Sequence, residues 1–156
     1  MSNQGTVFDK ILSDEIPAWK VWESREHLAF LTPFPNTRGL TIVIPKKKPG
    51  DYVFALPDQD YVSLMQATRV VARILERAFD VSRVAMVFEG TGVPHVHAKL
   101  IPLHGPLGSQ TGVWSKQEEF FPEYVGHIST VEGPRLADEE LDAIRDRIRR
   151  AAAAMP

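Results

Sequence analysis

Apolar residues recur along the chain with two different periods, one typical of helices and the other of strands. Between residues 61 and 78 they repeat with the period of an α-helix, so the sequence predicts one long helix from Pro57 to about Asp80. A short helix is expected just after Thr6, where Asp9 is placed to complete a capping box. A last helix is predicted to begin at Asp138, which we expect to cap it.

Segments that alternate apolar and polar residues, or that are rich in β-branched residues, predict strands. They are residues 18–23, 27–31, 40–44, 83–89 and the stretch within 92–102. Together with the helices they predict an α+β fold: an antiparallel sheet of about five strands, the long helix packed on it and a helix at the C-terminal end. Residues 103–134 show no clear period, and either a flap over a ligand or a segment covering the sheet fits them.

The strongest chemical signal is the alternating stretch His95-Val96-His97-Ala98-Lys99-Leu100-Ile101. In a strand, alternation places His95, His97 and Lys99 in a row on one open face, above an apolar inner face. Neutral imidazoles are nucleophiles or bases near neutral pH, and a neighbouring ammonium attracts phosphate. This arrangement therefore suits attack on a phosphorus atom, although a solvated strand face would also explain it.

Composition narrows the possible classes of protein. The chain has 156 residues and a net charge of −2, so it fits one domain without the basic bias of a nucleic-acid binder. It has no cysteine, which excludes disulfides and thiolate metal sites. No apolar run approaches membrane length and residues 1–5 have no signal core, so we expect a cytoplasmic protein with no membrane partner. Lys46 to Lys48 form a solvated turn or a phosphate-attracting rim, and the arginines between residues 145 and 150 are expected to be a solvated face.

The motif resembles the signature of the histidine-triad (HIT) superfamily, in which three histidines alternate with apolar residues, with Lys99 in the place of the third histidine. Segments 8–23 and 28–47 resemble the amino-terminal segment and the central strands of that family, in the right order. The resemblance implies a single HIT-like domain over residues 1–156, with its core at about 7–104 and an extension at 105–156. It also implies a homodimer.

The resemblance further implies a role for each residue of the motif. His97 matches the histidine that attacks the α-phosphorus of a nucleotide, His95 matches the one that helps to hold and polarise the site, and Lys99 would bind the phosphate oxygens. We expect further nucleotide or phosphate contacts from residues near the motif. They are Glu89, Gly90, Thr91, Gly92, Thr32 and His104.

Three further positions depart from the family pattern. Thr32 stands where an aspartate usually contacts ribose, and Leu40 and Lys48 stand where histidines are common. The favoured hypothesis is a hydrolase or nucleotidyl transferase acting on dinucleoside polyphosphates or nucleoside phosphoramidates through a nucleotidyl-histidine, without a cofactor or a metal. Two alternatives stay open: a nucleotide-binding module with little or no turnover, and a metal site built on His95 and His97 with Glu89 or His104.

Overall fold

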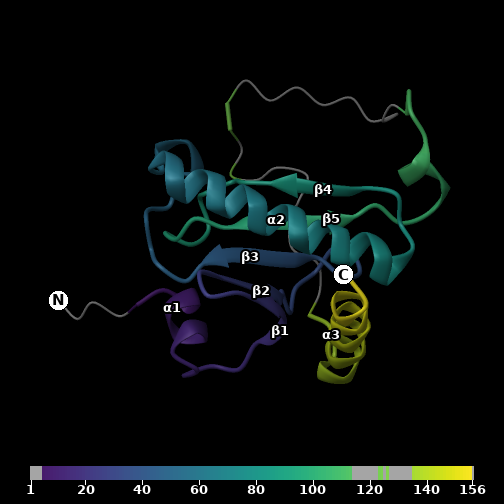
Figure 1. The fold of residues 1–156 in the computed structure, drawn as a ribbon, viewed down its shortest axis with the longest axis horizontal. Coiled ribbons are helices and arrows are strands. Elements are labelled where there is room, and N and C mark those ends of the chain that lie inside the picture. The colour runs from purple at the N-terminus through teal and green to yellow at the C-terminus, as the bar shows by residue number, and fades with distance from the viewer. Residues whose placement is uncertain (1–4, 114–122, 125, 127–134, 156) are drawn as a thin grey trace.

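The backbone is built around a five-stranded sheet in which every neighbouring pair of strands is antiparallel (Figure 1). The structure is a computed structural model that describes residues 5–113, 123, 124, 126 and 135–155. The strands lie in the order β1-β2-β3-β5-β4. Their bounds are Trp19–Glu23 for β1, His27–Leu31 for β2, Thr41–Pro45 for β3, Val84–Val87 for β4 and Ala98–Pro102 for β5. The predicted α+β architecture is confirmed.

Three helices surround the sheet, close to their predicted bounds. They are α1 at Val7–Leu12, α2 at Asp58–Phe79 and α3 at Asp138–Ala153, with short 3₁₀ turns at Val53–Ala55 and Pro106–Ser109. The predicted capping box at the start of α1 is present, because Thr6 and Asp9 each bond the backbone N–H of the other. The left-handed backbone of Asp80, with φ at 52°, ends α2 at the expected residue. Among these helices, none is long and apolar enough to cross a membrane.

The prediction that Asp138 caps the last helix is wrong. Ala137 is the N-cap, and Asp138 is already the first helical residue. The Asp138 carboxylate accepts a hydrogen bond from the Arg135 guanidinium at 2.6 Å. It therefore stabilises the helix through its charge near the positive end of the helix dipole and not as a cap.

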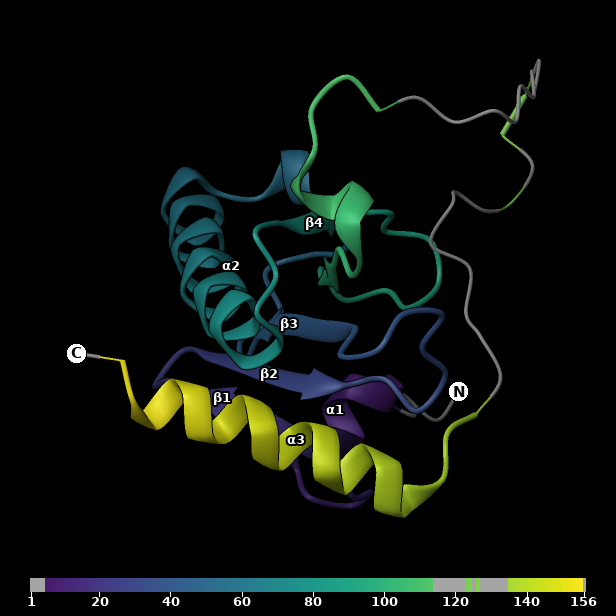
Figure 2. The ribbon, with the colours of Figure 1, turned by 90° about the vertical axis from the view of Figure 1, so that its right-hand side faces the viewer.

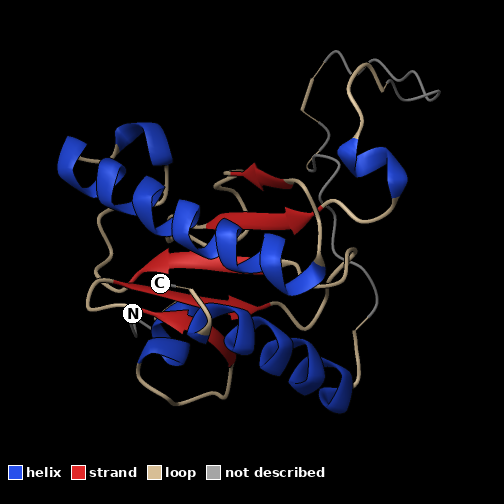
Figure 3. Ribbon diagram, turned by 45° about the vertical axis from the view of Figure 1, so that its right-hand side comes forward, coloured by secondary structure: helices blue, strands red, loops and turns tan. Residues whose placement is uncertain are grey.

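The sheet has an apolar core on each of its two faces. On one face, α2 packs against β3 and β5 residues such as Val43 and Leu100, and α3 packs against β1 and α2, beside the β1 edge of the sheet (Figures 1 and 2). On the other face, Phe8 and Ile11 of α1 pack with Phe30 and neighbouring apolar residues of β2 and β3. Every residue of β2 and β3 is consequently buried, which confirms the predicted buried central strand. Figure 3 shows the strands in red with the helices in blue around them.

The motif does not form one continuous strand. β5 begins at Ala98, so His95, Val96 and His97 precede it in an irregular segment. The pairing of β4 with β5 is antiparallel as predicted, but residues 88–97 connect the two strands, a longer link than a turn at Gly90 to Gly92 alone. The expected open face is also wrong, because His95 and His97 are only 0% and 6% exposed.

The arginines of α3 are not a purely solvated face. The Arg147 side chain donates to the carbonyl of Ala78 and lies over the Phe79 ring, 5.0 Å from its centre. Arg149 donates to the carbonyl of Lys20 at 2.7 Å. These contacts tie α3 to the end of α2 and to β1. The flap or covering role expected of residues 103–134 falls largely outside the described residues.

Candidate functional site

The His95 imidazole is fixed by a bond to the far end of β3. Its Nε2 lies 2.8 Å from the carbonyl oxygen of Pro45. A carbonyl only accepts, so Nε2 carries the proton and Nδ1 of the neutral ring is left with a lone pair. Nδ1 is the one fully buried side-chain polar atom without a hydrogen-bond partner among the described residues, and Asp9 Oδ1 lies 4.0 Å from it. His95 therefore serves as a buried support and cannot itself reach a ligand freely.

The His97 imidazole is oriented by the backbone of His95. Its Nδ1 lies 2.8 Å from the His95 carbonyl oxygen and must donate to it. The proton of neutral His97 therefore sits on Nδ1, and the lone pair sits on Nε2. Nε2 has no hydrogen-bond partner among the described residues, which leaves it free to attack an electrophile.

Both imidazoles are held neutral by burial. Burial is the main cause that lowers the pKa of His95, and it outweighs the opposing effects of the Pro45 carbonyl and Asp9. Burial likewise lowers the pKa of His97, with a further lowering by the Lys99 charge, against the raising effect of its bond to His95. A neutral His97 keeps its lone pair at neutral pH.

An aromatic side chain of α1 keeps the two imidazoles in place. The Phe8 ring meets the His95 ring edge to face at 5.7 Å and the His97 ring at 5.2 Å, and it contacts Phe30 at 5.6 Å. Edge-to-face pairs of this kind stabilise one relative orientation of the rings. Sequence reasoning placed Phe8 in the segment 8–23 that resembles the family but gave it no contact with the motif, so that contact is a finding of the tertiary structure.

Lys99 lies on β5 beside a carboxylate. Its Nζ is 3.2 Å from Glu89 Oε2, and the two side chains are only 17% and 14% exposed. The Tyr124 hydroxyl donates to Glu89 Oε1 at 2.6 Å and lies 3.4 Å from the Thr91 hydroxyl. The hydrogen bond from Tyr124 is the largest cause that lowers the pKa of Glu89, so the carboxylate is ionised near neutral pH. Lys99 is therefore half of an ion pair.

The glycine-rich turn lies near this pair and packs on the segment that follows β3. The Val96 N–H donates to the Gly50 carbonyl at 2.8 Å. Gly90 has a positive φ of 76°, and a Cβ there would lie 3.4 Å from the Asp51 carbonyl oxygen. Gly92 has no atom within 4 Å of such a position. A larger residue at Gly90 would therefore strain the backbone.

Thr32 and His104, two other expected contacts, make bonds of their own. The Thr32 hydroxyl accepts from the Phe34 N–H at 3.2 Å. His104 Nε2 donates to the Arg38 carbonyl at 2.9 Å, and its ring packs on Phe79 at the end of α2. The observed contacts of His104 are thus with the α2 side of the molecule and not with the histidine pair.

Comparison with known proteins identifies the family of this chain. The model of the HIT domain matches residues 13–105, which is more than half of the chain. The chain belongs to the HIT domain family. It is similar to the Bacillus subtilis protein hit, with 29% identity over 140 residues that cover 86% of this chain and 96% of that protein.

Two further relatives extend the comparison. The adenosine 5′-monophosphoramidase of Saccharomyces cerevisiae is 28% identical to this HIT protein over 116 residues, which cover 74% of this chain and 73% of the yeast protein. The crystal structure of a Hit-like protein involved in cell-cycle regulation from Bartonella henselae superposes with a TM-score of 0.70 at 22% identity. The match covers 96% of this chain and 97% of that one. At that identity the likeness shows a shared fold.

Sequence reasoning did not place two charged residues, Asp9 and Lys48, beside His95. Asp9 was assigned only to the capping box, yet its carboxylate lies near His95 Nδ1 and 3.9 Å from the ammonium of Lys48. Hydrogen bonds from Thr6 are the main cause that lowers the pKa of Asp9, so it is ionised there. The presence of Lys48 where the family commonly has histidine was the one sequence signal for a charge at this place, but nothing in the sequence indicated that Lys48 lies close to Asp9.

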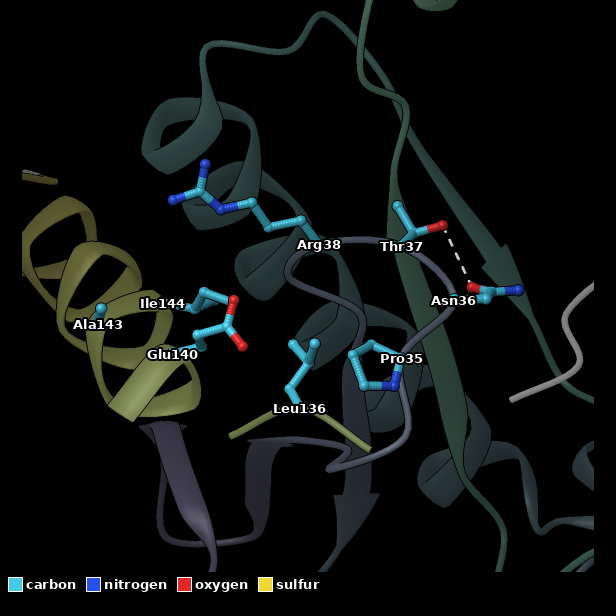
Figure 4. Close-up of a pocket in the computed structure, with 8 residues that line it drawn as sticks. All are labelled: Pro35, Asn36, Thr37, Arg38, Leu136, Glu140, Ala143 and Ile144. Atoms are coloured by element: carbon cyan, nitrogen blue, oxygen red, sulfur yellow. Dashed lines mark hydrogen bonds between the residues drawn. The ribbon is translucent and has the colours of Figure 1, made fainter. Parts of the chain in front are cut away.

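The described residues of this HIT protein contain no group of three or more histidine, aspartate or glutamate side chains placed to hold one metal ion. The ligands needed for the metal-site alternative, Glu89 or His104 with the histidine pair, are not brought together among those residues. A hollow of about 630 Å³ lies elsewhere, between the loop at residues 35–38 and α3 (Figure 4). Leu136, Glu140 and Ile144 line its α3 side, and no predicted site residue lines it.

Proposed function

We propose that this HIT protein is a nucleotide-binding enzyme that cleaves nucleotides at the α-phosphate through His97. The observation that supports this most directly is the orientation of His97. Its Nδ1–H is tied to the His95 carbonyl at 2.8 Å, so the lone pair of a neutral imidazole lies on Nε2. Burial lowers the pKa of His97 and thereby keeps that lone pair available near neutral pH.

The proposed reaction has two steps. His97 Nε2 forms a bond to the α-phosphorus while the bond from phosphorus to the leaving group breaks, which gives a nucleotidyl-histidine and a leaving group that takes up a proton. Water or another acceptor then attacks the phosphorus, the bond to Nε2 breaks, and the acceptor loses its proton. The substrate is a dinucleoside polyphosphate or a nucleoside phosphoramidate. The second class is supported by the yeast relative, which is named as an adenosine 5′-monophosphoramidase.

Other residues have supporting roles in this proposal. Lys99 offers an ammonium to the phosphate oxygens, and the backbone N–H groups of Gly90 to Gly92 offer further donors. Thr32 lies at the position expected to meet the ribose. His95 fixes the orientation of His97 through its backbone carbonyl, while its own ring is anchored to Pro45.

His97→Ala tests the role of the nucleophile. It should abolish hydrolysis of adenosine 5′-phosphoramidate and of diadenosine tetraphosphate, and it should leave binding of AMP within about tenfold because binding energy and chemistry are separable. His97→Asn is the matched variant, because its amide can still donate to the His95 carbonyl but cannot form the covalent intermediate. Mass spectrometry of wild-type protein quenched during turnover should show a nucleotidyl adduct on His97. Substantial turnover in both variants would remove His97 as the nucleophile.

A nucleotide-binding module with little turnover is the second candidate. The observation that favours it is the ion pair of Lys99 with Glu89, which leaves no free ammonium at the third position of the motif. AMP binding at the His97 face, without turnover of either substrate and without an adduct, would establish this alternative in place of the enzyme.

We further propose that the protein works as a cytoplasmic homodimer and does not bind nucleic acid. Among the described residues β4 pairs only with β5, so its outer edge is free, and Met86 on this strand is 47% exposed. Light scattering of the purified protein tests the dimer, and a monomer at micromolar concentration would refute it.

A further inference from the structure

A carboxylate lies in the part of the site where phosphate is expected to bind. Glu89 comes two residues after Val87, the residue of β4 that lies opposite Lys99 in the sheet. Its Oε2 receives the Lys99 ammonium at 3.2 Å, and its Oε1 accepts the Tyr124 hydroxyl at 2.6 Å. With both oxygens bonded, Glu89 is held in position beside the lysine.

The charges of this region cancel. His95 and His97 are neutral because burial lowers the pKa of each. Lys99 is matched by Glu89, and both side chains are mostly buried, so solvent screens their charges weakly. These four side chains therefore carry no net charge, so they have no positive charge to spare for a polyanion.

We propose that Glu89 sets the specificity of the site for the leaving group: it favours a nucleoside α-phosphate joined to an amine over one joined to a further phosphate. This inference rests on the proposed function and chooses between its two substrate classes. A departing phosphate would carry negative charge toward the Glu89 carboxylate and be repelled. A departing amine carries no negative charge, and if it gains a proton the carboxylate attracts it.

The Lys99–Glu89 pair also supplies the proton that an amine leaving group needs. As the bond between His97 Nε2 and phosphorus forms, the P–N bond breaks, and its electron pair on the leaving nitrogen takes a proton from the Lys99 ammonium. Glu89 holds Lys99 in place for this transfer. When water attacks the nucleotidyl-histidine, its proton returns to the Lys99 amine, the bond to Nε2 breaks, and a nucleoside monophosphate is released.

Glu89→Gln tests the specificity, because it removes the charge but keeps the size of the side chain. The measurement is the ratio of kcat/KM for adenosine 5′-phosphoramidate to that for diadenosine tetraphosphate. This ratio should favour the phosphoramidate in the wild type and fall by about tenfold or more in the variant, since a like charge at this range changes an equilibrium by at least that factor. Glu89→Asp retains the charge and should keep most of the preference.

Equilibrium binding separates this inference from the proposed function. In a His97→Asn background, Glu89→Gln should strengthen binding of ADP relative to AMP, and added salt should reduce the difference. If this shift is seen but the wild-type protein turns over neither substrate, the proposed enzymatic function is refuted, while the charge selectivity of Glu89 stands. An unchanged ADP-to-AMP ratio, an unchanged kcat/KM ratio or a wild-type preference for diadenosine tetraphosphate would overturn the role of Glu89.

Discussion

Acidification should destabilise this protein through three buried histidines. His27, His95 and His97 are 5%, 0% and 6% exposed, and burial is the main cause that lowers the pKa of each from its ordinary value of 6.5. The unfolded chain then binds protons that the folded chain does not. Stability is therefore complete above the ordinary histidine pKa and is lost as the pH falls below it, until the lower folded-state pKa is reached.

The size of this effect follows from the number of groups. Each histidine costs up to about 1.4 kcal/mol of unfolding free energy per pH unit in that window. Three histidines therefore give at most about 4 kcal/mol per pH unit, a large part of the roughly 5–15 kcal/mol that keeps an ordinary domain folded. The ionised carboxylates near these rings do not add to the slope there, because the pKa of Asp9 and of Glu89 is lowered from ordinary values of 3.8 and 4.5.

Urea denaturation followed by circular dichroism at about pH 7.5, 6.5 and 5.5 measures the slope directly. His27→Gln is the matched variant, because it removes one titrating ring at a distance in sequence from the motif. It should reduce the slope by about a third, whatever it does to stability at high pH. An unfolding free energy that stays level or rises between about pH 7.5 and pH 5.5 would show that the rings are not buried as neutral groups.

Two further variants test individual contacts of the site. Lys99→Met removes the proton donor proposed for the leaving amine, so kcat for adenosine 5′-phosphoramidate should fall and phosphate binding should weaken. It also removes the cation that lowers the pKa of His97 and leaves the Glu89 charge that raises it, so the acid limb of the remaining activity should move to higher pH. Measurements of rate against pH and AMP titrations check this, and profiles identical to those of the wild type would show that Lys99 takes no part in the reaction. Phe8→Ala removes a ring that is 6% exposed and contacts Phe30 and both motif histidines, so it should cost about 3–5 kcal/mol of unfolding free energy. Urea denaturation checks this second prediction, and a cost below about 1 kcal/mol would contradict the observed packing.

Local sequence determined most of the secondary structure of this protein. The period of apolar residues places α2, and Asp80, in a left-handed conformation, ends it. The capping box of Thr6 and Asp9 starts α1, because it needs only residues three apart. The β-branched run places the buried strand β3. These signals are short in range, so they can be read without knowing what packs on each element.

The sequence also indicated which residues make up the site, but the tertiary structure decided their backbone conformation, burial and partners. Alternation predicted a strand through His95 and His97, whereas pairing with β3 reaches only from Leu100 to Ala98. The preceding residues are held by Pro45 and Gly50, which lie about fifty residues earlier in the chain. Alternation indicates which side chains share a face, but it does not indicate where strand pairing stops.

The charge pairing within the site was decided by contacts between different elements of the fold. Lys99 reads as a free cation in the sequence, yet the link between β4 and β5 brings Glu89 to 3.2 Å from it. Asp9 reads as a helix cap, yet the packing of α1 on the sheet places it beside His95 and Lys48. Whether an ionisable group is buried, neutral or paired depends on every element around it. For that reason the motif alone identified the candidate nucleophile, and only the folded chain shows the proton on His97 Nδ1 and the carboxylate beside Lys99.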